Sequence, residues 1–173
     1  MVTGQQPQET YTLNTTESVI NWKGSYSFLF SEHTGTVHFI NGALYSSNGN
    51  ITGGDFSINM TTISNEGFLE GKGAVGHLRN EDFFDVEKYP LARLVITNVA
   101  YYEEDNKLHQ VEADFTIKGI TKPIKFNAFV NEEKKQMTAR LKLDRTLWGI
   151  NYNNKMKDHA ISETMEFDVL LQF

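Results

Sequence analysis

The sequence predicts an all-β protein, an eight-stranded antiparallel barrel with a short helix near residues 78–86 over one mouth. Three observations lead to this prediction. Apolar and polar residues alternate with a period of two along most of the chain, as in strands that bury one face. Short turn-forming sequences, such as Asn41-Gly42 and Asn48-Gly49, separate the alternating runs. Aromatic residues, which suit pleated surfaces, make up 12% of the chain.

Eight apolar runs follow one another along the chain, and we expect each to form one strand. Their apolar positions are Ile20 and Trp22; Val37 and Phe39; Phe56, Ile58 and Met60; residues 94–100; Val111, Ala113, Phe115 and Ile117; Ile124, Phe126, Ala128 and Val130; Leu141 and Leu143; and Met165, Phe167, Val169, Leu171 and Phe173. Residues 119–123 are the expected connection of one hairpin. Antiparallel strands with one apolar face must close or pair as sheets to hide that face.

The segment at residues 78–86 lacks the alternation. Leu78 and Asp82 lie at helical spacing, and Asn80 is a suitable N-cap with acidic residues directly after it. Tyr89-Pro90 then ends the segment, because the residue before a proline is disfavoured in a helix. We therefore expect a short helix that lies across one mouth of the barrel.

Length and charge exclude several classes of protein. A chain of 173 residues fits one domain, and the absence of cysteine excludes disulfides and thiolate metal sites. The net charge of −6 argues against a nucleic-acid partner, and no apolar run reaches the length of a membrane-spanning helix. Residues 1–10 are polar, so we expect a flexible segment there and no secretory signal within it. That leaves a cytoplasmic protein or an exported one whose signal was removed.

No sequence motif for catalysis is present, and we expect no catalytic residue, metal or cofactor. The chain has no G-x-S-x-G elbow, no H-E-x-x-H motif and no P-loop. His77, Glu81 and Asp85 would share one face if the helix began at His77, which leaves a metal- or carboxylate-dependent hydrolase as an alternative. The other interpretation of these three residues is a helix start with solvated carboxylates.

The apolar residues themselves are the remaining functional signal. An eight-stranded barrel either fills its interior with side chains or holds one small ligand. Aromatic residues on many strands favour a cavity, because stiff rings form walls and ligand pockets are lined in this way. Phe83 and Phe84 on the expected helix would then act as a lid, or else as a plug. The alternative is a structural or interaction domain with a solid core.

Several segments together resemble the YceI-like family of lipocalin-fold proteins. They are HTGTV at residues 33–37, HLRNEDFFD at 77–85, YP at 89–90, DFTIKGITKP at 114–123 and DRTLWG at 144–149. Their order and spacing cover nearly the whole chain from residue 11 to residue 173. The resemblance implies a single β-barrel domain over residues 11–173 that carries a polyisoprenoid, an isoprenoid quinone or a fatty-acid-like lipid.

The resemblance also implies a periplasmic or secreted protein, with transient membrane contact and a homodimer as further expectations. Arg79 and His77 are the expected contacts for a polar head group, Arg79 to a phosphate and His77 to a quinone carbonyl. The full set of expected ligand-binding residues is Trp22, Phe28, Phe30, Phe39, Phe56, Ile58, His77, Leu78, Arg79, Phe83, Phe84, Phe115, Phe126, Trp148 and Phe167.

Overall fold

The computed structural model describes residues 7–25, 32–65, 78–102, 105–151 and 162–173. Within them lie nine strands and one short 3₁₀ helix, so the expected all-β fold is confirmed. The elements are β1 (Glu9–Thr12), β2 (Val19–Ser25), β3 (Glu32–Ser47), β4 (Asn50–Asn65), β5 (Leu91–Tyr102), β6 (Asp105–Ile117), β7 (Ile120–Asn131), β8 (Gln136–Asp144), η1 (Arg145–Trp148) and β9 (Thr164–Gln172).

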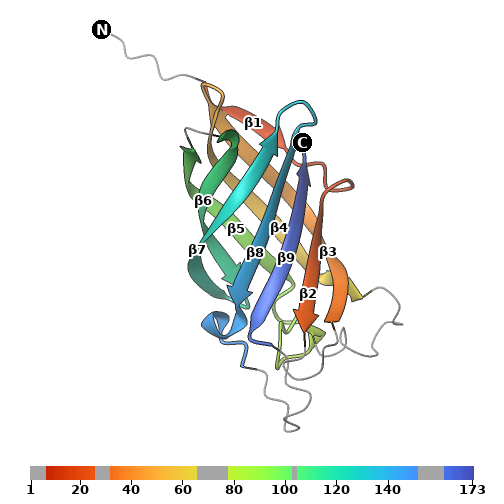
Figure 1. Ribbon diagram of the computed structural model, residues 1–173. Coiled ribbons are helices and arrows are strands. Elements are labelled where there is room, and N and C mark those ends of the chain that lie inside the picture. The colour runs from red at the N-terminus through yellow and green to blue at the C-terminus, as the bar shows by residue number, and fades with distance from the viewer. Residues whose placement is uncertain (1–6, 26–31, 66–77, 103–104, 152–161) are drawn as a thin grey trace.

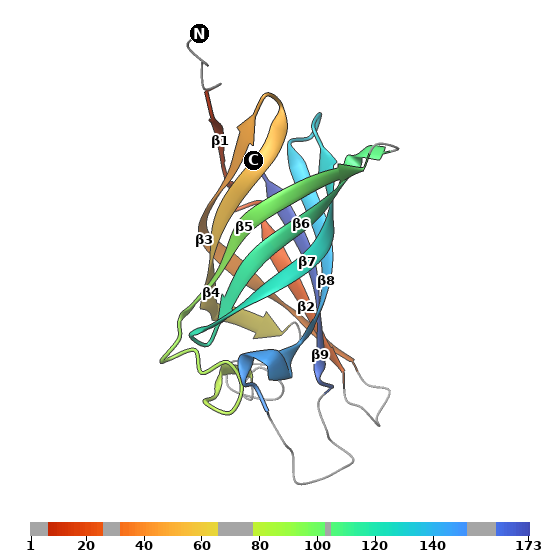
Figure 2. The same ribbon diagram turned by 90° about the vertical axis from the view of Figure 1, so that its left-hand side faces the viewer.

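Strands β2 to β9 form one closed antiparallel barrel (Figures 1 and 2). The sheet runs in the order β1-β3-β2-β9-β8-β7-β6-β5-β4, and the further pairing of β3 with β4 closes it. β1 is the extra strand, and it pairs with the end of β3 nearest the β3–β4 turn, with Tyr11 opposite Leu44. We call that end of the barrel the upper end, as drawn in Figure 1, and the end at η1 the lower end.

Two tight turns set the register of the long hairpins. Asn48 and Gly49 connect β3 to β4, and Lys118 and Gly119 connect β6 to β7, each with positive φ at both residues. Such turns match the right-handed twist of the strands that they join. The β6–β7 connection is therefore shorter than the expected residues 119–123, and Pro123 lies inside β7, opposite Asp114.

The segment at residues 78–86 differs from the expected helix. Only Leu78 and Arg79 are helical, and turns follow as far as residue 88. The backbone N–H groups of Phe83 and Asp85 both donate to the carbonyl of Asn80, at 3.0 and 2.8 Å. Asp85 has a φ of 48°, which a right-handed helix does not allow. The segment still lies across the lower end of the barrel, where Phe83 and Phe84 are buried.

Apolar side chains fill the inner face of the barrel and charged ones occupy the outer face. Ion pairs join Arg93 to Asp55, Lys125 to Glu112, Arg140 to Asp168 and Lys142 to Glu166, each between adjacent strands and each exposed. Exposed pairs of this kind contribute little to stability, so burial of the inner face is what holds the barrel together. In the described part of the chain, no helix is long and apolar enough to cross a membrane.

Candidate ligand cavity

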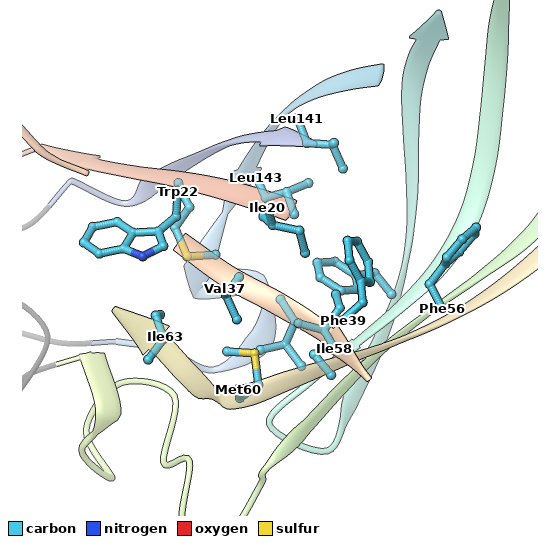
Figure 3. Packing of buried hydrophobic residues seen from close by; sticks show 14 of the residues in the cluster. Ile20, Trp22, Val37, Phe39, Phe56, Ile58, Met60, Ile63, Leu141 and Leu143 are labelled. Carbon is cyan, nitrogen blue, oxygen red and sulfur yellow. The ribbon is translucent and has the colours of Figure 1, made fainter. Parts of the chain in front are cut away.

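The barrel encloses a cavity of about 120 Å³. Every barrel strand contributes residues to its wall, and so does the turn segment at the lower end. Figure 3 shows part of this wall, with Trp22, Val37, Phe39 and Met60 projecting from their strands into the interior. The lining is almost entirely apolar, because alternate residues of each strand face inward and those residues are the apolar ones.

Ten of the residues expected from the sequence to bind a ligand line this cavity. They are Trp22, Phe39, Phe56, Ile58, Leu78, Phe83, Phe84, Phe115, Phe126 and Phe167. They come from seven different elements, and the closed sheet brings them around one space. Their position on the wall is a structural finding, and ligand binding by them stays a prediction.

Two of the other five expected residues, Arg79 and Trp148, do not line the cavity. The guanidinium of Arg79 donates to the backbone carbonyl of Thr61 at 2.9 Å, and Arg79 is not part of the cavity wall. Trp148 is 1% exposed and its indole N–H donates to the carbonyl of Phe115 at 3.0 Å, so it packs beside the wall and does not line it. Phe28, Phe30 and His77 lie outside the described residues.

Apart from Ile58 and Leu78, sequence reasoning missed the aliphatic and methionine residues of the wall. Among them are Ile20, Val37, Met60, Met137, Met165 and Leu171. The signal for most of them was present, because they occupy the same alternating positions as the aromatic residues. Three of the chain's five methionines line the cavity. A methionine side chain is unbranched and flexible, so this wall can change shape at low energetic cost.

Glycines in the strands explain how large rings fit against the wall. A Cβ on Gly35 would lie 2.6 Å from the Trp22 ring, and one on Gly42 would lie 2.5 Å from the Phe56 ring. In both cases the glycine and the ring are opposite each other on paired strands. The ring therefore covers the neighbouring backbone where a side chain is missing. This arrangement keeps Trp22 and Phe56 close to the wall.

Buried aromatic rings and a buried cation close part of the lower end. The rings of Phe83 and Phe84 meet edge to face at 4.8 Å, and the guanidinium of Arg145 lies 5.5 Å from the Phe83 ring. Arg145 is 3% exposed and donates to the backbone carbonyls of Ile150 and Ser162. Burial lowers the pKa of the Arg145 guanidinium from its usual value. The side chain holds three separate segments of the lower end together.

A polar cluster closes part of the upper end. The Tyr101 hydroxyl accepts a hydrogen bond from the backbone N–H of Ile51 and also lies 3.3 Å from the Ile51 carbonyl. The Tyr101 ring packs edge to face on His109, which is 3% exposed, with 4.4 Å between ring centres. Burial raises the pKa of the Tyr101 hydroxyl. These bonds tie β5 and β6 to the start of β4.

The cavity wall offers an apolar environment with few polar side chains. The wall residues with polar side chains are Lys23, Thr138, Ser162 and Thr164. Lys23 and Ser162 lie at the lower end of the barrel, so polar groups meet the cavity near that rim. Among the described residues, no group of three or more His, Cys, Asp or Glu side chains is placed to hold a metal ion. The expected triad of His77, Glu81 and Asp85 is not tested, because His77 lies outside the described residues.

The profile of the YceI-like domain matches residues 11–173. Among curated proteins, a UPF0312 protein of Pseudomonas putida strain F1 is 42% identical over 59 residues, and one of Photorhabdus laumondii is 39% identical over 59 residues. Each match covers 34% of this chain, and it spans about 30% of the length of the relative.

Solved structures with the same fold cover almost the whole chain. Burkholderia cenocepacia BcnA is 15% identical with a TM-score of 0.70, and covers 92% of this chain and 98% of its own. A polyisoprenoid binding domain from Saccharophagus degradans, implicated in plant cell wall breakdown, is 14% identical with a TM-score of 0.62. That match covers 96% of this chain and 97% of the domain. At these identities the likeness concerns the fold.

Proposed function

Because the chain belongs to the YceI-like family, we propose that its barrel binds a long apolar ligand and carries or sequesters it. The ligand is a polyisoprenoid, an isoprenoid quinone or a fatty-acid-like lipid. The observation that carries the proposal is the cavity inside the barrel, to whose wall every barrel strand contributes apolar residues. The polyisoprenoid binding domain with the same fold supports the choice of ligand class.

The size of the cavity determines how a long ligand is accommodated. An engineered cavity of about 150 Å³ with an apolar lining binds benzene, so the free space of about 120 Å³ here holds only a short piece of a hydrocarbon chain. A longer tail must displace side chains that now fill the barrel. Met60, Met137 and Met165 are the wall residues best suited to move, because their side chains have three rotatable bonds.

The driving force is transfer of hydrocarbon from water into the barrel. Each buried methylene contributes roughly 0.8 kcal/mol, so one isoprene unit contributes about 3–4 kcal/mol before costs. Ordering a flexible tail and moving wall side chains offset part of this gain. Affinity therefore rises with tail length until the displaced side chains find no further space.

The proposal describes a binding protein without catalysis. Its support is the scarcity of polar side chains on the described cavity wall, which leaves an apolar tail without a reactive group beside it. We also propose a periplasmic or secreted location, which the resemblance to the family implies. The rival is a structural domain whose interior accepts no ligand.

The first experiment is analysis of protein purified from cells without detergent. Extraction into organic solvent and mass spectrometry should detect one apolar lipid in stoichiometric amount. Titration of delipidated protein with cis-parinaric acid should then show saturable binding at one site. Absence of bound lipid together with absence of saturable probe binding would support the structural domain. Weak binding that does not saturate would indicate exposed apolar surface.

A further inference from the structure

The wall of the barrel has an incomplete join between β7 and β8. These strands pair only over residues 128–131 and 136–139, at the upper end. Within the described residues, the remainder of β7 (residues 120–127) and of β8 (residues 140–144) make no backbone pairs with each other. Figure 1 shows the two strands diverging toward the lower end. We call this gap in the hydrogen-bond ladder the β7–β8 seam.

Each side of the seam is firmly held by its other neighbour. β7 pairs with β6 from Ile120 to Phe129, and β8 pairs with β9 over its whole length from Gln136 to Asp144. Separation of the strands at the seam therefore breaks no backbone ladder. Pro123 fits this arrangement, because a proline is tolerated within a strand where its missing N–H faces an open edge.

Apolar side chains cover the seam from the inside. Phe126 of β7 and Leu141 of β8 both line the cavity, and Phe126 is only half-buried. Neighbouring Ile124 is also half-buried and packs against the core. Rotation of these side chains would connect the cavity to the outside without exposing a charged group to the interior.

Apolar surface also lies outside the wall at the upper end of the seam. A shallow groove of about 630 Å³ crosses the outer face there. Its lining includes the apolar Phe129, Leu108 and Leu170, together with the ion pair of Arg140 and Asp168. Phe129 is 49% exposed. Thr138 and Ala139 belong to the lining of both the groove and the cavity, so the two spaces lie on opposite faces of the same stretch of β8.

From this geometry, and on the basis of the proposed function, we propose that the apolar tail enters and leaves the barrel sideways through the β7–β8 seam. The tail first lies in the outer groove and then passes between Phe126 and Leu141 into the cavity. The strands hinge about their paired upper residues. The competing route is the lower rim near Lys23 and Ser162, where the cavity also reaches the end of the barrel.

The test is a reversible crosslink across the seam. The chain has no cysteine, so Lys125→Cys with Lys142→Cys places the only two thiols on outward positions of the two strands. A bis-maleimide with a disulfide in its linker then joins them, and mass spectrometry verifies the product. The matched control is Glu112→Cys with Lys125→Cys, a pair in register on β6 and β7, where the ladder is complete.

Stopped-flow mixing with cis-parinaric acid measures the rates. The seam crosslink should slow association and dissociation at least tenfold with little change in Kd, and cleavage of the linker should restore both rates. The control crosslink should change the rates less than twofold. Equal rates in the two crosslinked proteins would contradict entry through the seam and would assign passage of the tail to the lower rim. Absence of probe binding before crosslinking would instead overturn the proposed function, and the seam with it.

Discussion

The Phe56 ring occupies the space that a side chain at Gly42 would need. The two residues are opposite each other on β4 and β3, and a Cβ on Gly42 would lie 2.5 Å from Cδ1 of Phe56. On its other side, Cε2 of the same ring lies 2.9 Å from the Cβ position of Gly54. The two glycines thus provide the room in which the ring lies against the wall.

Replacement of Gly42 by alanine should destabilise the barrel. The added methyl group forces the Phe56 ring toward the cavity, and overpacking of this kind costs about 1–3 kcal/mol. Urea unfolding followed by circular dichroism measures the change. Gly53→Ala is the control, because its Cβ would lie 3.5 Å from the Tyr45 ring, an ordinary contact. It should change the free energy of unfolding by less than about 1 kcal/mol. Equal losses in the two variants would contradict the steric explanation.

Filling the cavity should weaken ligand binding. Leu94 lines the cavity and the next residue, Val95, does not, although both are partly buried on β5. Leu94→Trp should therefore weaken binding of cis-parinaric acid at least tenfold, because the larger ring takes the space of the tail. Val95→Trp adds the same side chain at the adjacent position and should leave Kd within twofold. Thermal melts of both variants show whether the fold is retained.

The ion pair of Asp55 and Arg93 should give a small dependence of stability on pH. Hydrogen bonding from Arg93 lowers the pKa of the Asp55 carboxyl below its ordinary value of 3.8. A lowered folded pKa means that the stabilising contribution is complete above the ordinary value and is lost as the pH falls through the folded value. Asp55→Asn should therefore reduce the urea midpoint at pH 7, and the difference should vanish in strong acid. Both side chains are substantially exposed, so the effect is small.

The control for this pH dependence is Asp114→Asn on β6. Asp114 is exposed and its direct cross-strand partners are Val95 and Pro123, so it has no basic partner in register. A pH-dependent loss of the same size in both variants would show that it arises from the net charge and not from the pair with Arg93.

The alternation of apolar residues was sufficient to predict the strands of the barrel. The alternate residues of β9 from Met165 to Leu171 face inward as the pattern requires, because the pleat of a strand fixes a period of two. The same pattern does not distinguish a wall residue from a core residue. Trp148 shows the difference: its ring is as buried as any, yet the 3₁₀ helix turns it toward the Phe115 carbonyl and away from the cavity.

Features that depend on contacts between distant parts of the chain could not be predicted from the sequence. Leu78 and Asp82 have helical spacing, but only Leu78 and Arg79 are helical, and turns with a positive φ at Asp85 follow. Phe83 is buried beneath the barrel in this turn segment, a contact with distant strands that local spacing does not reveal. The β7–β8 seam depends on how two twisted strands diverge below the pair of Ala128 and Ala139, toward the lower end. Pro123 was the one sequence feature related to the seam, and we expected it to belong to the connection at residues 119–123.

The two tryptophans give the most direct test of where a ligand lies. Trp22 lines the cavity, whereas Trp148 does not, and each donates one indole hydrogen bond at 3.0 Å to a backbone carbonyl, of Ser64 and Phe115 respectively. Trp22→Phe and Trp148→Phe each remove one of these hydrogen bonds, so both should lose stability by about 0.5–1.5 kcal/mol.

Ligand binding should change the fluorescence of Trp22 and leave the fluorescence of Trp148 nearly constant. A tail in the cavity displaces the surroundings of the Trp22 indole, so binding should shift the fluorescence of the Trp148→Phe variant and leave that of Trp22→Phe nearly constant. Titration of both variants with a saturated, non-fluorescent fatty acid measures this. The opposite result would place the ligand against Trp148, below the cavity. It would contradict binding within the cavity, because the tail would then not contact the wall that Trp22 helps to form.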